Sequence, residues 1–174
     1  MRVRLNLLAG VIASLAMSMT AQAQEARPPC AQLDASLPSE LSAWSQRLDL
    51  VSAARATDLG KAELTPGRTV AAALHPTSAV TYVTPPGKPA ADGHGGLFRL
   101  RIDHPGTYRV VLGSGGWIDM LKNGAAVASS AHSPGPACSS ARKMVDFPLE
   151  RSDYVLQVSA SADPTVAILI IPRP

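Results

Sequence analysis

Alternating hydrophobic and polar positions dominate the second half of the chain. Residues 97–102 alternate apolar with charged side chains, and the same period of two returns at 108–112, 117–121, 145–149 and 154–158. Such alternation gives a strand one buried side and one solvent-facing side. Residues 166–171 form a continuous apolar run instead, which predicts a strand covered on both faces.

The first third of the chain carries a helical signal followed by two strand signals. Leu41, Trp44 and Leu48 recur at helical spacing, so they predict one short helix whose packed face includes Trp44. The runs 69–74 and 79–83 are short and rich in residues that favour strands.

Turn residues separate these elements. Asn123-Gly124 predicts a tight hairpin, because both residues accept positive φ angles, and the Pro- and Gly-rich stretch 85–96 predicts a long surface loop, as does polar 129–140. About eight or nine short strands with one short N-terminal helix predict an all-β, jelly-roll-like β-sandwich.

The N-terminus has the pattern of a secretory signal peptide. A basic start, an apolar stretch and Ala21-Gln22-Ala23 predict a signal peptide over 1–23, with no membrane span after its removal. A lead containing Cys30 then covers 24–36, and a single sandwich domain covers 37–174. We therefore expect a periplasmic or secreted protein.

Composition and charge narrow the possible partners. The 174 residues are 46% hydrophobic and 17% charged, which suits one folded domain. Removing Arg2 and Arg4 leaves 14 basic against 13 acidic residues, a net charge of +1. Nucleic acid is an unsuitable partner, because binding it requires a clustered basic surplus. The seven aromatic residues lie on predicted strands or the helix and mark the core.

Cys30 and Cys138 are the two cysteines of the chain. In an oxidising compartment such a pair predicts a disulfide, which here closes a loop of about 108 residues worth about 4 to 5 kcal/mol in the chain-entropy model. A redox-active or metal-binding thiol pair is the alternative, but the Cys-x-x-Cys spacing is missing.

The sequence contains only weak signals for a catalytic or metal site. A facial metal triad needs two histidines and a carboxylate, and Asp92, His94 and His132 are the least unsuitable candidates, so we expect no metal or cofactor. The chain has no Gly-x-Ser-x-Gly elbow and no Walker motif. The acids are scattered singly, which leaves glycoside hydrolysis open without a local signature for it.

Two groups of residues suggest binding. Arg142 and Lys143, with His132 in the same loop region, suit a carboxylate, sulfate or phosphate, although these cations also fit a solvated strand start. Trp117 and Asp119 suit a sugar platform. Alternation places them on the face opposite Ile118 and Met120, but it leaves open which face is core. The expected partner is an anionic small molecule, a glycan or an envelope protein.

Two resemblances accompany these patterns. The first is carried by 98–102, 105–110, 117–119 and 153–158, which resemble the β-sandwich appendage domains of secreted bacterial peptidases. Over the whole chain, the sequence is similar to small exported proteins of sphingomonad-type bacteria that have no established activity. That second similarity rests on 64–67, 95–98, 117–119, Cys138 and 142–147.

The second resemblance also implies an activity. Such proteins often carry the label homogentisate 1,2-dioxygenase, which implies a much longer cytoplasmic cupin enzyme holding iron by two histidines and a carboxylate. This chain differs in length, compartment and ligand pattern. We expect a non-catalytic exported binding or interaction module. A small metal-dependent oxygenase is the alternative, and an envelope structural protein is a third class.

Overall fold

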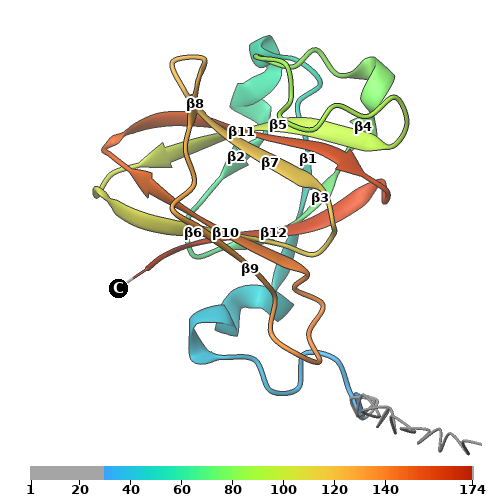
Figure 1. Ribbon diagram of the computed structural model, residues 1–174, viewed down its shortest axis with the longest axis vertical. Helices are drawn as coiled ribbons and strands as arrows, with labels where there is room; N and C mark the ends of the chain where they lie inside the picture. Colours follow the sequence, from blue (N-terminus) through green and yellow to red (C-terminus); the bar gives the residue numbers. More distant parts are fainter. Residues whose placement is uncertain (1–29, 174) are drawn as a thin grey trace, which may run out of the picture.

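The computed structural model describes residues 30–173, and this part of the chain folds into two β-sheets packed face to face (Figure 1). The predicted signal peptide and residues 24–29 of the lead lie outside the described residues. The first sheet runs in the order β1 (Arg47–Val51), β3 (Thr69–Ala73), β12 (Thr165–Pro172), β6 (Gly106–Leu112), β10 (Lys143–Leu149) and β9 (Ala131–Pro134). The second runs β2 (Glu63–Leu64), β5 (His94–Ile102), β11 (Ser152–Ser161), β7 (Trp117–Lys122) and β8 (Ala125–Val127), and β4 (His75–Pro76) also pairs with β5.

The central strands have jelly-roll connectivity. Eight strands form the jelly roll, and they are numbered first to eighth in chain order: β3, β5, β6, β7, β8, β10, β11 and β12. One sheet contains the first, eighth, third and sixth of them, in the order β3-β12-β6-β10. The other contains the second, seventh, fourth and fifth, in the order β5-β11-β7-β8. Neighbours among these eight are antiparallel. The all-β, jelly-roll-like prediction is confirmed. The described residues form twelve strands rather than eight or nine, because short strands are added at the sheet edges.

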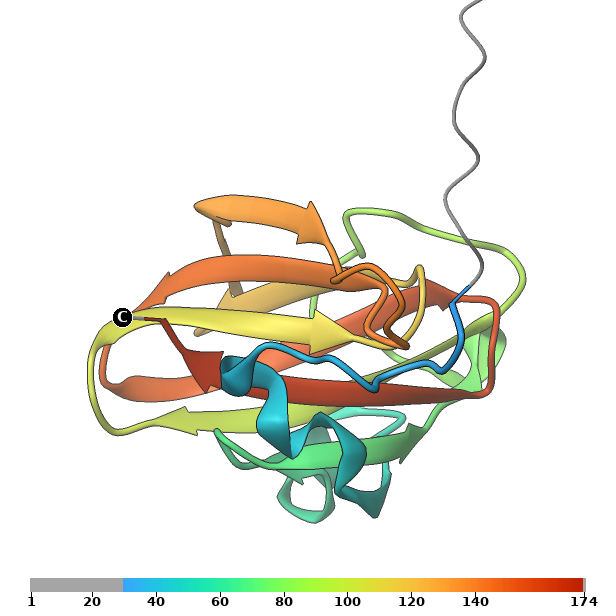
Figure 2. The same cartoon turned by 90° about the horizontal axis from the view of Figure 1, so that it is seen from below.

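Burial of β12 on both faces is confirmed. Ile168 and Ile170 point into the main core between the sheets, whereas Leu169 and Ile171 belong to a second apolar cluster on the outer face of the first sheet. Leu41 and Trp44 of η1 (Ser39–Ser45) cover that outer face and are fully buried there. Figure 2 shows this N-terminal segment lying across the sheet.

The predicted helix is correct at Leu41 and Trp44 and wrong at Leu48. η1 is a short 3₁₀ helix that ends at Ser45, and Leu48 lies in β1, where it is 54% exposed. The pattern of residues 47–51 is compatible with a strand as well as with a helix. The strand forms because parallel pairing with β3 gives its backbone a hydrogen-bonded ladder. No helix within residues 30–173 has the length and apolarity to cross a bilayer.

The strand predicted at 79–83 is wrong. The chain forms η3 (Thr77–Ala79) and then an irregular segment, in which Thr81 N–H donates to Ala54 O and Val83 N–H donates to the side chain of Gln157. These isolated hydrogen bonds satisfy the backbone groups without a strand ladder. A short apolar run is therefore not sufficient evidence for a strand. Another short 3₁₀ helix, η2 (Ala56–Lys61), precedes β2.

The remaining turn predictions hold in large part. The Asn123-Gly124 hairpin between β7 and β8 is confirmed, with φ angles of 52° and 78°. The Pro- and Gly-rich loop ends at residue 93, because His94 begins β5, and the predicted 129–140 loop contains the short edge strand β9.

The predicted disulfide between Cys30 and Cys138 is present, with 5.4 Å between the Cα atoms. Hydrogen bonds support it on both sides. Asp34 N–H donates to Cys138 O at 2.9 Å, and the Asp34 carboxylate accepts from the backbone and hydroxyl of Ser140. Because Trp44 Nε1 also donates to the Ser140 hydroxyl, the N-terminal segment is joined to the 135–142 loop at several points.

Candidate ligand-binding pocket

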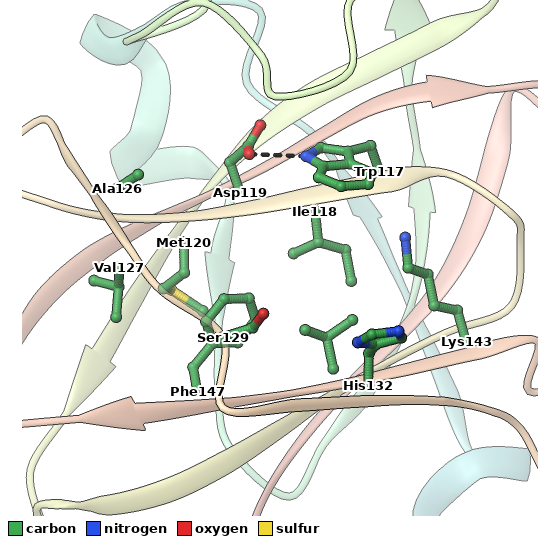
Figure 3. A pocket seen from close by; sticks show the side chains of 11 residues that line it. Trp117, Ile118, Asp119, Met120, Ala126, Val127, Ser129, His132, Lys143 and Phe147 are labelled. Carbon is green, nitrogen blue, oxygen red and sulfur yellow. Dashed lines mark hydrogen bonds between the residues drawn. The ribbon is translucent and has the colours of Figure 1, made fainter.

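A pocket of about 270 Å³ opens at one edge of the sandwich, where β7 and β8 of the second sheet face β9 and β10 of the first (Figure 3). Residues 128–130, which connect β8 to β9, cross between the two sheets beside it. The lining residues are Trp117, Ile118, Asp119, Met120, Ala126, Val127, Ser129, His132, Lys143, Val145 and Phe147.

Strand periodicity explains why the first sheet contributes these side chains. Lys143, Val145 and Phe147 are every second residue of β10, so they share one face of the sheet. His132 lies opposite Val145 in the antiparallel register with β9 and therefore projects to the same side. The result is one cation and one imidazole beside two buried apolar residues.

The second sheet supplies the opposite wall in the same way. Ile118 and Met120 alternate along β7 and are buried, and Val127 on β8 pairs directly with Met120. Ile118, Met120, Val145 and Phe147 are also members of the main core. The pocket is therefore the place where the apolar core between the sheets reaches the surface.

Trp117 and Asp119 lie on the outer face of β7. Trp117 is 38% exposed, while Ile118 and Met120 face inward, which answers the question that alternation left open. Trp117 Nε1 donates to Asp119 Oδ1 at 2.9 Å, and Figure 3 shows both side chains above the strand. The other Asp119 oxygen accepts from Gly87 N–H at 3.1 Å. Both carboxylate oxygens thus have partners within the protein.

Lys143 connects the two sheets at one end of the pocket. Its ammonium lies 4.8 Å from the centroid of the Trp117 ring and donates to Gly116 O at 3.1 Å. Burial lowers the pKa of Lys143 from its ordinary value, the charge of Lys88 lowers it further, and Asp119 opposes the change. Among residues 30–173, no carboxylate lies within the 4.0 Å of an ion pair with Lys143.

The segment 83–88 packs against the outer face of β7 and β11. The fully buried Gln157 accepts from the N–H groups of Val83 and Thr84, and Ser159 donates to Lys88 O at 3.2 Å. A Cβ at Gly87 would lie 2.7 Å from Trp117 Nε1, so glycine permits this close approach. These contacts hold Lys88 near the Lys143 end of the pocket.

The structure brings together four of the five predicted binding residues. His132 and Lys143 line the pocket between the sheets, and Trp117 and Asp119 border it from β7 with their side chains on the outer face of that strand, whereas Arg142 is exposed just before β10 and does not line it. Sequence reasoning missed the apolar wall and Lys88. Alternation marks the wall residues only as core, because nothing in the sequence tells which part of a core reaches the surface.

The candidate metal residues are divided between the two sheets. His94 begins β5, near one edge of the second sheet, and Asp92 lies in the loop two residues before it, whereas His132 is on β9 at an edge of the first sheet. His94 lies opposite Pro76 and Ser161, and its Nδ1 is buried with no hydrogen-bond partner among the described residues. Within residues 30–173, no three His, Cys, Asp or Glu side chains form a group suited to a metal ion.

No known family model matches this chain, and no curated protein matches its sequence. The fold and the pocket are therefore the basis for a functional proposal.

Proposed function

We propose that this protein is an exported, non-catalytic β-sandwich binding module that holds a small ligand between β7–β8 and β9–β10. The observation that carries the proposal is the pocket itself, in which the apolar core opens beside Lys143 and His132. Small-molecule sites are commonly apolar concavities with a few polar groups at defined positions. Export is supported by the signal-like residues 1–23 and by the disulfide, which suits an oxidising compartment.

A glycan is a weaker choice of ligand for this site. A sugar platform requires a free aromatic face beside free hydrogen-bonding groups. The Lys143 ammonium lies over the Trp117 ring, and both Asp119 oxygens already accept hydrogen bonds. The apolar pocket on the other side of β7 therefore supports ligand binding better than the exposed face of Trp117.

The proposal is tested by methyl NMR of the disulfide-bonded mature protein, residues 24–174, titrated with hexanoate and, separately, with hexan-1-ol. At least one probe is expected to shift the methyl signals of Ile118, Val127 and Val145. Ser129→Trp places a bulky group at the pocket rim and is expected to abolish those shifts. Ala128→Trp is the control, because Ala128 is exposed and does not line the pocket. Unchanged methyl signals with both probes would reject the proposal.

A further inference from the structure

We infer that the ligand of this pocket is a small apolar carboxylate, whose hydrocarbon part lies between the sheets and whose carboxylate pairs with Lys143. This inference rests on the proposed binding function and specifies the chemistry of the ligand. It is carried by two properties of the pocket, its apolar walls and the position of its cation.

The walls favour a small hydrocarbon group. Ile118, Met120, Val127, Val145 and Phe147 supply side chains from both sheets, and the weakly accepting sulfur of Met120 is the one polar atom among these five side chains. The volume of about 270 Å³ lies just below the range of about 300–1,000 Å³ that is typical of sites for drug-sized ligands. A short aliphatic chain or a single ring is the appropriate size.

Lys143 favours an anionic group at the end of that hydrocarbon. Its ammonium has three donors, and Gly116 O is its one hydrogen-bond acceptor among the described residues. Among residues 30–173, six Lys and Arg residues have carboxylate partners, including Arg99, Arg109 and Lys122, and every unpaired one other than Lys143 is exposed to solvent. Lys143 has none within 4.0 Å, so a ligand carboxylate would supply the missing counter-charge.

The surrounding groups preserve this preference. Lys88 adds positive potential at Lys143. Asp119 is the acid that faces the cation, but its two oxygens accept from Trp117 Nε1 and Gly87 N–H instead. His132 lines the same pocket and offers a ring N–H as a second donor. A ligand amine would meet like charge at this position, and a neutral head group would leave Lys143 without a carboxylate at ion-pair distance.

The experiment compares three ligands with the same hydrocarbon chain and different head groups: hexanoate, hexan-1-ol and hexylamine. Isothermal titration calorimetry or NMR titration of the mature protein measures each Kd. Hexanoate is expected to bind at least about tenfold more tightly than hexan-1-ol, because a charge-assisted hydrogen bond is worth about 1.5–3 kcal/mol. Hexylamine is expected to bind most weakly of the three.

Variants separate the role of the charge from that of the fold. Lys143→Gln is expected to weaken hexanoate about tenfold while changing hexan-1-ol by less than twofold, and Lys143→Arg is expected to retain much of the hexanoate affinity. Arg151→Gln, which removes an exposed cation outside the pocket, is the matched control. Retained hexan-1-ol binding shows that the variant pocket is folded.

The outcomes distinguish the two proposals. Equal affinity for hexanoate and hexan-1-ol, or tighter binding of hexylamine, overturns the carboxylate inference and leaves the binding pocket standing. Equal loss of hexanoate and hexan-1-ol in Lys143→Gln also overturns it, because the effect is then not one of charge. If no probe binds the wild-type protein, the proposed binding function fails and the inference fails with it.

Discussion

Among individual residues, Asp146 shows how a buried charge is stabilised in this fold. Its carboxylate accepts two hydrogen bonds from Arg109, at 2.7 and 2.8 Å, and both side chains are about nine-tenths buried. Glu40 on η1 pairs with Arg109 at 3.2 Å and with Arg173 at 3.0 Å. The network therefore connects the N-terminal helix to β6, β10 and the C-terminal end of the described chain.

Asp146→Asn is expected to lower the free energy of unfolding by about 3 kcal/mol, because it leaves the buried Arg109 guanidinium without its main partner. Glu40 still pairs with Arg109, which keeps the loss near the lower end of the usual range of about 3–5 kcal/mol. Urea denaturation measures the change. Asp49→Asn is the control, because Asp49 is exposed on β1 and forms no ion pair within the described residues. Equal stability of the two variants would contradict the assigned role.

The same carboxyl group predicts a pH dependence. The hydrogen bonds from Arg109 lower the pKa of Asp146, and the positive charges of Arg109 and Arg173 act in the same direction. The folded pKa is thus below the unfolded pKa of about 4, so the stabilisation is complete above the unfolded value and is lost as pH falls through the folded value. Urea denaturation of the wild type is expected to show this loss below pH 4. Asp146→Asn is expected to show a shallower decline over the same interval.

Among the elements, the irregular segment 83–88 is held at its start by one strand residue. Gln157 of β11 accepts from Val83 and Thr84 N–H and donates to Thr84 O at 3.3 Å. A buried side-chain amide thereby replaces the ladder that a paired strand would provide. The predicted strand at 79–83 and the observed irregular chain differ for this reason: a distant residue satisfies the backbone.

Gln157→Ala is expected to raise the hydrogen-exchange rates of the Val83 and Thr84 amides about tenfold or more, because each loses its acceptor. Amides of β6 and β10, in the other sheet, are expected to keep their protection. Gln46→Ala is a control, since Gln46 is exposed and contributes its backbone rather than its side chain to the contacts described. Unchanged exchange at Val83 and Thr84 would show that other contacts hold the segment.

At the scale of the whole molecule, the disulfide connects the start of the described chain to a late loop. The bond spans 108 positions, and its two ends belong to segments that pack on the outer face of the first sheet. Removing such a constraint increases the conformational entropy of the unfolded chain, which lowers its free energy by about 4 to 5 kcal/mol in the chain-entropy model. Its contribution is thus to stability rather than to the pocket, which lies between the sheets.

The double variant Cys30→Ala, Cys138→Ala is expected to lose on the order of 4 kcal/mol in urea denaturation while keeping a β-type circular dichroism spectrum. Hexanoate affinity, if present in the wild type, is expected to change little under conditions where the variant is folded. Asp34→Ala, which removes the hydrogen bonds to Ser140 but keeps the disulfide, is expected to lose about 1–2 kcal/mol. A loss below 1 kcal/mol in the double variant would contradict the proposed stabilisation.

Local patterns were sufficient for much of this fold. Alternation located the long strands, the Asn123-Gly124 dipeptide located a hairpin, and the apolar run at 166–171 indicated a strand covered on both faces. Each of these features depends on residues that are neighbours in sequence: side-chain direction in a strand alternates with period two, and a tight turn needs particular φ angles. The class of fold followed from their number and spacing.

The tertiary structure alone decided which face of β7 is buried, which strands lie at the sheet edges and where the core opens to the surface. Trp117 and Lys143 are 26 positions apart, on different sheets, and their contact exists only because jelly-roll pairing brings β7 and β10 to the same edge. His132 joins them through its register with Val145. The sequence by itself determined the long strands of the sandwich and the positions of the charged residues. The pairing of distant strands determined that an unpaired cation lies beside an open part of the core, because register and sheet order depend on the whole chain.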